Sequence, residues 1–404
     1  MTPRRTVAVL GAGIMGSATA LHLARRGVRV IVFEREGEPF RGASRWNEGK
    51  IHLGFLYAAD PGLATARALL PGGLDFARQI RELTGTSLDA STTGADDLYL
   101  IHRDSVIGAD AAAAYFERVA RLVREHPDAG GYLADVSECR APRLSGGELE
   151  RVADASAVVA AFRVPERSVD TNHVADVFLA ALAGEASVEL ACEHPVAGVS
   201  PAGGGSWTVQ AAGQSHGPFD AVVNALWEGR PAIDRALGHD PDRSPQHRYR
   251  VSVFARSAAP LQVPSAVVAV GPFGDIKNYT GRDLYLSWYP AGLLARGEAT
   301  APPPVPALDD AGRARIADAV FTGLEGALPW VEEVRDALTE IRVEGGWVYS
   351  QGRGLLDDPK ASVHRRDRHG ISRRGSYFSV DTGKYSIAPT LAERLAREIA
   401  ESGR

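Results

Sequence analysis

The first 34 residues of the chain are arranged as a strand, a glycine turn, a helix and a second strand, and this order restricts the fold more than any other feature. Gly11, Gly13 and Gly16 form a G-x-G-x-x-G spacing between an apolar run at 7–10 and a helical run that ends at Gly27. Such glycines allow a tight turn, a close approach of pyrophosphate to the backbone, and close packing of helix on sheet. Phosphates then lie at the helix N-terminus, where free backbone N–H groups and the helix dipole stabilise them. We therefore predict a parallel α/β sheet whose turn binds a dinucleotide through Gly11, Ala12, Gly13, Ile14, Met15 and Gly16.

An acidic residue marks the end of the second strand, which covers residues 28–33. Glu34 follows this strand directly, and Arg35 comes next. A carboxylate at this position accepts hydrogen bonds from the ribose hydroxyls of the dinucleotide. It also opposes a 2′-phosphate, because like charges would face one another at close range. We expect Glu34 and Arg35 to bind the adenosine end of the cofactor; the alternative is a structural glycine turn without a ligand.

Length and composition exclude several classes of protein. The 404 residues suggest two or three lobes, and 45% hydrophobic residues without a membrane-spanning apolar run predict a soluble, cytoplasmic protein. The net charge of −5 gives no reason to expect a nucleic-acid partner. Cys139 and Cys192 lack metal-ligand spacing, so neither a disulfide framework nor a metal site is expected. The sequence does not indicate an oligomeric state.

Apolar periodicity predicts helices at 65–83, 111–125, 174–183, 311–324 and 391–400, and strands at 97–102, 221–226 and 338–349. Residues 188–192 and 207–211 are expected to pair across the glycine-rich turn at 203–205, and 248–290 to form an antiparallel sheet. We expect a discontinuous layout, with a dinucleotide-binding domain at 1–87, 150–232 and 345–404 and a substrate domain at 88–149 and 233–344.

Two further motifs accompany the glycine turn, and they carry a resemblance to a known family. Residues 42–54 are G-A-S-R-W-N-E-G-K-I-H-L-G, and residues 382–386 are T-G-K-Y-S. The first is similar to a flavin-contacting loop and the second to a segment that meets the flavin pyrimidine edge. With the glycine turn, they resemble the D-amino-acid oxidase and glycine oxidase superfamily of FAD-dependent oxidoreductases, which includes L-2-hydroxyglutarate dehydrogenase and flavin-linked glycerol-3-phosphate dehydrogenases. The three motifs frame nearly the whole chain.

The resemblance implies an α/β fold, in which a discontinuous Rossmann-like FAD-binding domain carries an inserted antiparallel-sheet substrate domain. It also implies FAD held noncovalently, since neither cysteine lies in the C-terminal region where one branch of the family attaches flavin. Backbone N–H groups at 383–386 and the Lys384 ammonium would stabilise negative charge on the reduced flavin. The alternative for both later motifs is an ordinary surface turn. Besides the glycine turn, Glu34 and Arg35, the expected FAD contacts are Ser44, Arg45, Asn47, Gly49, Lys50, Ile51, Val196, Asn224, Ala225, Gly383, Lys384, Tyr385 and Ser386.

The family reaction transfers a hydride from a carbon bearing OH or NH2 to flavin N5, and O2 or another acceptor reoxidises the flavin. No second glycine fingerprint is present, so the electrons are expected to come from a small-molecule substrate and not from a bound nicotinamide. An alcohol needs a base for its hydroxyl proton, whereas a neutral amine needs none. His52 is the candidate base, with a histidine that only hydrogen-bonds backbone or flavin as the alternative.

The Ile-His loop weakly favours a hydroxy compound, and an amine or amino-acid oxidase of the same superfamily is the alternative. A non-catalytic flavin-binding protein and an NAD-dependent dehydrogenase are further alternatives. Leu56 stands where the glycerophosphate branch has an arginine, which counts against a phosphorylated triol.

Arginine is expected to bind a substrate carboxylate through its planar fork. Arg353, after the strand at 338–349, is the first candidate, and Lys50 is either a second substrate contact or solvated. The arginine run at 365–374 is expected to be a solvated face.

Overall fold

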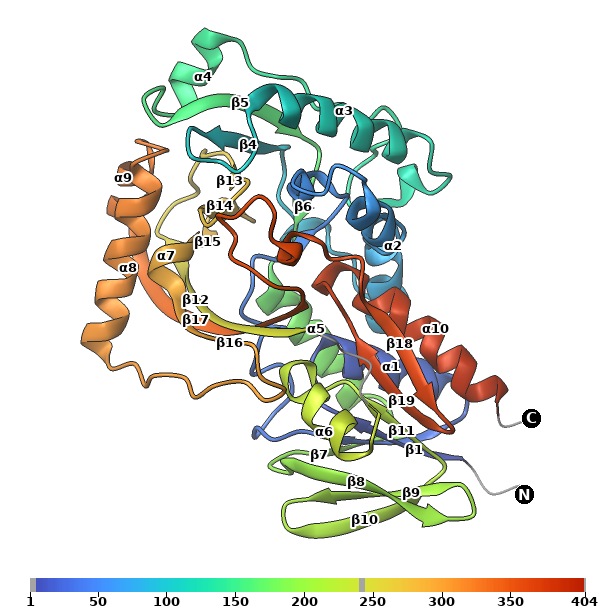
Figure 1. The fold of residues 1–404 in the computed structure, drawn as a ribbon. Coiled ribbons are helices and arrows are strands. Elements are labelled where there is room, and N and C mark those ends of the chain that lie inside the picture. Colours follow the sequence, from blue (N-terminus) through green and yellow to red (C-terminus); the bar gives the residue numbers. More distant parts are fainter. Residues whose placement is uncertain (1–4, 240–243, 403–404) are drawn as a thin grey trace.

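The computed structural model describes residues 5–239 and 244–402 as two large β-sheets with helices packed on them (Figure 1). The first sheet has six strands, and all but the edge strand β18 run parallel to their neighbours. In sheet order the strands are β18 (Gly370–Arg374), β19 (Tyr377–Asp381), β11 (Ala221–Asn224), β1 (Thr6–Leu10), β2 (Arg29–Phe33) and β7 (Val188–Ala191). Three distant parts of the chain therefore build one parallel sheet, which confirms the expected Rossmann-like α/β fold.

Helices cover one face of this sheet, and a small sheet covers the other. The helical layer contains α1 (Ile14–Arg25), α2 (Ala64–Thr84), α5 (Thr171–Ala183) and α10 (Ala388–Glu401). The small sheet is antiparallel and contains β10 (Gln214–Phe219), β9 (Ser206–Ala211) and β8 (Val196–Gly203), below the six-stranded sheet in Figure 1. Successive residues of β1 enter opposite cores, Val9 with the helices and Leu10 with the small sheet. Both faces are apolar, as expected for a buried parallel strand.

The second large sheet lies beside the first and is mostly antiparallel; β13 and β4 are parallel neighbours. In sheet order it contains β16 (Leu293–Gly297), β12 (Pro245–Ser257), β15 (Asp283–Trp288), β14 (Gly274–Asn278), β13 (Ala266–Ala269), β4 (Asp97–His102) and β5 (Val158–Val164), and β17 (Leu338–Gln351) also pairs with β12. A separate two-stranded ladder joins β3 (Lys50–Ile51) to β6 (Arg167–Ser168). The remaining helices are α3 (Ala109–Arg124), α4 (Gly146–Val152), α6 (Arg230–Ala236), α7 (Tyr289–Gly292), α8 (Asp310–Glu325) and α9 (Val331–Asp336). Helix α8 packs on β12, β15 and β17, so this sheet has its own core.

One expected strand pairing is wrong. Residues 188–191 form β7 and pair with β2, whereas β9 pairs with β8 across the turn at 203–205. A tight glycine turn joins the two strands that directly flank it, and β8 begins only at Val196. The last helix also begins three residues earlier than expected, at Ala388, with Pro389 in its first turn. Proline fits there because the first N–H groups of a helix have no intrahelical partner.

The two-domain division remains a proposal, with two changes at its boundaries. Strand β5 lies within the range 150–232 assigned to the FAD-binding domain, yet it pairs with β4 in the second sheet. Residues 345–351 likewise pair with β12 as the end of β17. Both segments therefore belong with the substrate domain, because a strand shares the core of the sheet that it completes.

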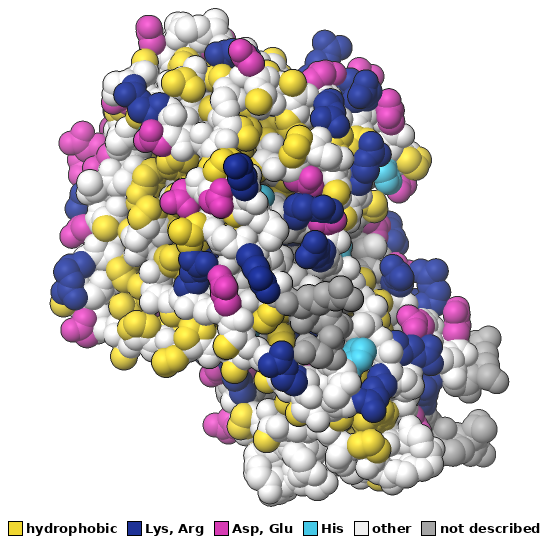
Figure 2. Space-filling view, viewed as in Figure 1, with side chains coloured by type: hydrophobic (Ala, Val, Ile, Leu, Met, Phe, Trp, Pro, Cys, Tyr) yellow, Lys and Arg dark blue, Asp and Glu magenta, His cyan; other side chains and the backbone are white. Residues whose placement is uncertain are grey.

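The surface carries mixed charge on the face shown in Figure 2. Lys and Arg side chains are interspersed with Asp and Glu there, and no extended field of one sign is visible. Across residues 5–239 and 244–402, no helix has both the length and the apolar character needed to span a bilayer.

Candidate active site

A cavity of about 580 Å³ receives residues from both large sheets, and we call it the long cavity. The glycine turn lines one part of it, and Lys384, His52 and Arg366 line another. Aromatic walls come from Trp46, Tyr285 and Trp347. The expected site residues that line it are Gly11, Gly13, Ile14, Met15, Glu34, Arg35, Ser44, Asn47, Lys50, His52, Val196, Ala225, Gly383, Lys384 and Tyr385.

The glycine turn presents backbone to this cavity. Helix α1 begins at Ile14 with Gly13 as its N-cap, which has no side chain to cap the helix, and its first turn has no acidic residue. The Ile14 N–H donates to Ser44 Oγ at 3.0 Å. A Cβ on Gly13 would lie 2.8 Å from the same oxygen, so a larger residue would displace Ser44 Oγ from this position. Open N–H groups at a helix start suit a pyrophosphate.

The Glu34 carboxylate is held at the cavity wall by backbone groups. Its Oε2 accepts from the Ala12 N–H at 2.8 Å, and its Oε1 accepts from the Glu36 N–H at 3.1 Å. Each carboxylate oxygen keeps a further lone pair for a ribose hydroxyl. Arg35 pairs with the buried Glu228 at 3.1 Å, and both line the long cavity. These groups fit an adenosine end without a 2′-phosphate.

Positive charge lines the other part of the long cavity. Burial and the Arg366 guanidinium lower the pKa of Lys384 to about 7. An anion beside Lys384 would restore its charge, since opposite charge favours the ionised form. With the glycine turn and the aromatic walls, these residues fit FAD: the turn would hold the pyrophosphate, and Lys384 would stand by the flavin. Neither cysteine lines the long cavity, in keeping with noncovalent binding.

Several expected FAD contacts do not line the long cavity: Ala12, Gly16, Arg45, Gly49, Ile51, Asn224 and Ser386. Gly16 instead lets α1 approach the turn, because a Cβ there would lie 1.9 Å from the Gly11 carbonyl oxygen. Asn224 donates to Tyr377 Oη at 2.8 Å and to Asp234 at 3.1 Å, within a buried network under the sheet. Arg45 pairs with Asp176 at 2.9 Å. Gly16, Asn224 and Arg45 thus have roles in packing, hydrogen bonding or ion pairing within the protein.

The structure does not bring Arg353 to a cavity. Its side chain is exposed on the turn after β17, where Gly352 and Gly354 both have positive φ angles. Arg366 lines both cavities, although the arginine run at 365–374 was expected to be solvated. Within that run Arg365 pairs with Asp367, two residues on, and this leaves Arg366 free to point inward. In the sequence, the i, i+2 spacing of Arg365 and Asp367 was the one indication that these two residues pair with each other while Arg366 faces the other way.

A second cavity of about 210 Å³ adjoins the first, and we call it the inner cavity. The two share Glu48, Lys50, Arg250, Val348, Arg366 and Lys384 as lining residues. Arg248 and Arg250 of β12 also line the inner cavity, on one face of the strand because side chains alternate along it. The Arg-Tyr-Arg spacing at 248–250 was not predicted as part of the site.

Tyr289 lies beside both arginines of β12. Arg248 Nη1 donates to Tyr289 Oη at 3.5 Å, and Arg250 Cζ lies 4.8 Å from the ring centroid of Tyr289. The Nε atoms of Arg248 and Arg250 are buried and have no hydrogen-bond partner among the described residues. Arginine rarely leaves such groups unpaired, so the inner cavity is suited to an anion.

His52 lies at the wall of the long cavity. Burial, with the nearby Lys384 and Lys50, holds its pKa well below the usual 6.5. Its Nδ1 is buried without a partner among the described residues, and its ring lies 5.3 Å from that of Tyr57. The imidazole is therefore neutral at physiological pH, and it is a weak base.

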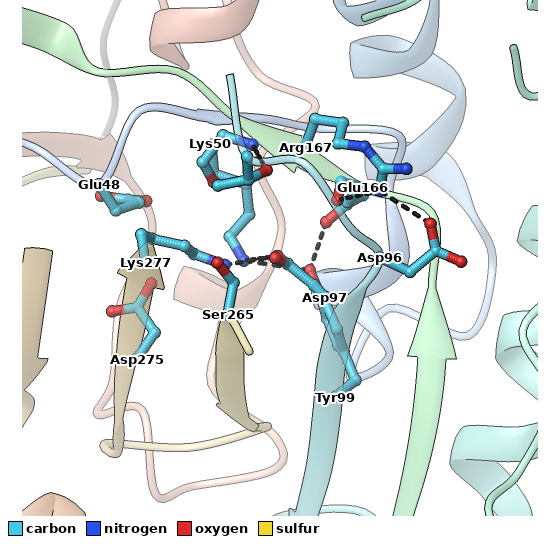
Figure 3. Close-up of polar contacts among 12 residues, drawn as sticks. Glu48, Lys50, Asp96, Asp97, Tyr99, Glu166, Arg167, Ser265, Asp275 and Lys277 are labelled. Atoms are coloured by element: carbon cyan, nitrogen blue, oxygen red, sulfur yellow. Dashed lines mark hydrogen bonds and ion pairs between the residues drawn. The ribbon is translucent and has the colours of Figure 1, made fainter. Parts of the chain in front are cut away.

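A buried charge cluster holds the loop that carries His52 (Figure 3). Lys50 of β3 and Lys277 of β14 both donate to Asp97 Oδ2, and the Lys50 distance is 3.3 Å. All three side chains are at most 1% exposed. Although burial would raise the pKa of Asp97, the two ammonium groups keep it below its usual range. The cluster therefore connects β3 to both β4 and β14 of the second sheet.

Glu166 holds the same loop from a second side. It accepts from the backbone N–H groups of Leu53 at 2.6 Å and Gly54 at 3.0 Å, and from Tyr99 Oη. Two backbone bonds and one phenol satisfy the carboxylate, so residues 50–54 have a defined path beside the cavity. Within the described ranges, no group of three or more His, Cys, Asp or Glu side chains could hold a metal ion.

Comparison with known families decides the class of the protein. A family model described as FAD dependent oxidoreductase matches residues 6–364. The chain belongs to this family. It is therefore an FAD-dependent oxidoreductase, and the resemblance to this family is confirmed. Bound FAD would accept a hydride at its flavin N5 atom.

Individual relatives agree with the family. D-amino acid dehydrogenase 2 of Mesorhizobium japonicum is 34% identical over 131 residues, which cover 28% of this chain and 32% of that protein. The match thus spans about a third of that relative's length. Glycine oxidase from Geobacillus kaustophilus has a TM-score of 0.66 at 18% identity, with 99% of this chain and 95% of that chain covered. Iminodiacetate oxidase from Chelativorans sp. BNC1 has a TM-score of 0.65 at 16% identity, with 98% and 95% covered. At such identities the structural likeness establishes the fold.

The charge cluster generates a stability prediction. Asp97→Asn leaves two buried lysines without a countercharge, which should cost about 3–5 kcal/mol of the free energy of unfolding. The neighbouring Asp96→Asn is the matched control, because Asp96 pairs with Arg167 at 2.8 Å at a partly exposed position. It should cost less than about 1 kcal/mol. Urea unfolding of both variants measures the difference, and equally small losses would contradict the cluster's role.

Proposed function

We propose that this FAD-dependent oxidoreductase oxidises a small amino or imino acid at the C–H bond beside its nitrogen. The observation that carries the proposal is a set of arginines without ion-pair partners at the inner cavity, of which Arg248 is buried and Arg250 and Arg366 are partly buried. Arg248, Arg250 and Arg366 line it, and none forms an ion pair with a described carboxylate. A guanidinium fork matches a carboxylate through two parallel hydrogen bonds. The substrate carboxylate would bind there, with the reacting carbon toward the long cavity.

The state of His52 supports an amine in place of the hydroxy compound that its loop favoured. Oxidation of an alcohol requires a base for the hydroxyl proton, whereas a neutral amine carries no proton that must leave first. His52 has its pKa held well below 6.5 by burial, so it accepts a proton poorly. The relatives support the same choice, because they are named D-amino acid dehydrogenase, glycine oxidase and iminodiacetate oxidase. We expect O2 or another electron acceptor to complete the cycle.

A matched substrate panel tests the reaction type. Purified holoprotein is mixed without oxygen with amino acids and their 2-hydroxy counterparts, such as alanine with lactate and aspartate with malate, in both enantiomers. We expect an amino member to bleach the flavin absorption at least about tenfold faster than its hydroxy counterpart, a difference of about 1.4 kcal/mol in barrier. Faster bleaching by the hydroxy acids would contradict the proposal, and so would a purified protein that binds no FAD.

Arg366 and its neighbour provide a paired test of carboxylate binding. Arg366→Gln removes a charge-assisted contact of about 1.5–3 kcal/mol, so kcat/KM should fall roughly 10- to 100-fold. Arg365→Gln alters an exposed residue that pairs with Asp367, and it should leave kcat/KM unchanged. Burial and repulsion by Arg248 lower the pKa of Arg366 to about 9, so its removal should not lower Tm. Equal losses of activity in both variants would refute the assignment.

A pH profile separates an amine from an alcohol. If the neutral amine reacts, kcat/KM rises with pH, and its midpoint follows the amine pKa from one substrate to another. Because the pKa of His52 lies well below 6.5, His52→Gln should keep this rising limb above about pH 6.5. Loss of the limb in His52→Gln, with the wild-type midpoint constant across substrates, would instead indicate a histidine base and an alcohol substrate.

A further inference from the structure

We propose that the substrate carries two anionic groups, the carboxylate beside the reacting carbon and a second carboxylate or phosphonate. This inference rests on the proposed oxidation of an amino or imino acid and specifies the charge of its side chain. Its basis is an imbalance of charge at the inner cavity. Of the five lysine and arginine side chains that line the inner cavity, four have no ion-pair partner among the described residues, and their charge exceeds by more than one unit what a simple amino acid carboxylate can compensate.

The four cations are Arg248, Arg250, Arg366 and Lys384. Among the described residues, none of them forms an ion pair with a carboxylate, although 5–239 and 244–402 contain many other ion pairs. Glu48 is the carboxylate of the cavity wall that interacts with these cations most directly. Burial would raise its pKa, whereas Lys384 and then Arg250 lower it. One carboxylate against four cations leaves an excess of three positive charges.

The other charged residues of the wall do not change this excess. Lys50 and Asp275 also line the inner cavity. Lys50 shares Asp97 with Lys277, and Asp275 interacts electrostatically first with Lys277 and then with Lys50. Two lysines and two carboxylates thus balance one another in the buried cluster, toward the left and centre of Figure 3. Asp275 also acts on Arg250, after Glu48, but its charge is already counted against the lysines of the cluster.

The excess can be divided between cofactor and substrate. Lys384 lies in the T-G-K-Y-S segment and lines both cavities, so it is the cation placed to serve the flavin. Two positive charges remain for the substrate. A monocarboxylate would leave one buried guanidinium charge uncompensated, which is costly in a low-dielectric site. A dianion leaves none.

Polar atoms of the arginines that lack hydrogen-bond partners agree with the charge count. The Nε atoms of Arg248 and Arg250 are both buried without a hydrogen-bond partner among the described residues. Arg248 is 3% exposed, and burial followed by repulsion from Arg248 lowers the pKa of Arg366 to about 9. The cations therefore destabilise one another until anions separate them. A volume of about 210 Å³ suits a short aliphatic chain between two such groups.

Isosteric substrates test the charge directly. Holoprotein is reduced anaerobically with aspartate against asparagine, glutamate against glutamine, iminodiacetate against sarcosine, and 2-amino-3-phosphonopropionate. We expect a substrate with two anionic groups to give at least about a tenfold higher reduction rate per unit concentration than its monocarboxylate partner. The phosphonate arm shows whether the second group is a carboxylate or a phosphonate. Equal rates with the monocarboxylate partners would overturn the inference of a second anionic group but would leave amino-acid oxidation in place. If no compound of the panel reduced the flavin, the proposed function itself would be overturned.

Ligand binding tests the proposed second anionic group even if no substrate is turned over. Succinate and succinamate differ only in a carboxylate against an amide, and both perturb the flavin spectrum if they bind beside it. We expect succinate to bind at least about tenfold more tightly. Arg248→Gln should reduce this preference to less than about threefold with FAD retained, and the exposed Arg353→Gln should preserve it. Equal affinities in the wild type, or a preference that survives Arg248→Gln, would overturn the inference.

Discussion

Two lysines from separate segments share one buried carboxylate, and the geometry of the site depends on this contact. Lys50 lies within the motif at 42–54, Lys277 belongs to the second sheet, and both donate to Asp97 Oδ2. Removing one partner of such a cluster leaves an uncompensated buried charge, so the three groups hold one arrangement. Glu166 accepts two backbone N–H groups of the next residues along the chain. The loop that carries His52 is thereby held against the second sheet, where the two cavities meet.

Two kinds of buried charge lie side by side, and they serve different ends. In the cluster, lysines and carboxylates compensate one another, which suits a rigid support. At the inner cavity, Arg248, Arg250 and Arg366 have no carboxylate partner among the described residues, and their charge is available to a ligand. Compensated charges favour the stability of the fold, whereas binding an anion requires positive charges that no protein carboxylate neutralises. Tyr289 and the apolar walls support the arginines without neutralising them.

Local features of this protein could be predicted from its sequence, and long-range partners could not. The glycine turn depends on backbone sterics within a few residues, so the run of β1, α1 and β2 follows from the motif, whereas the contact of Ile14 with Ser44 does not. Strand 188–191 was assigned the wrong neighbour because apolar alternation does not specify which strand completes a sheet. Arg353 and Arg366 differ only in how the chain folds after β17, which no local pattern contains. Asn224 looked like a cofactor contact, yet it binds Tyr377, which lies 153 positions along the chain.

A crystal structure of the holoprotein with a bound dicarboxylate, such as succinate, tests the central claim most directly. The account predicts FAD in the long cavity, with its pyrophosphate at the N-terminus of α1, and the dicarboxylate in the inner cavity. One carboxylate should contact Arg366 and the other the arginines of β12. Density for the dicarboxylate at Arg353, or FAD placed away from the glycine turn, would contradict the account.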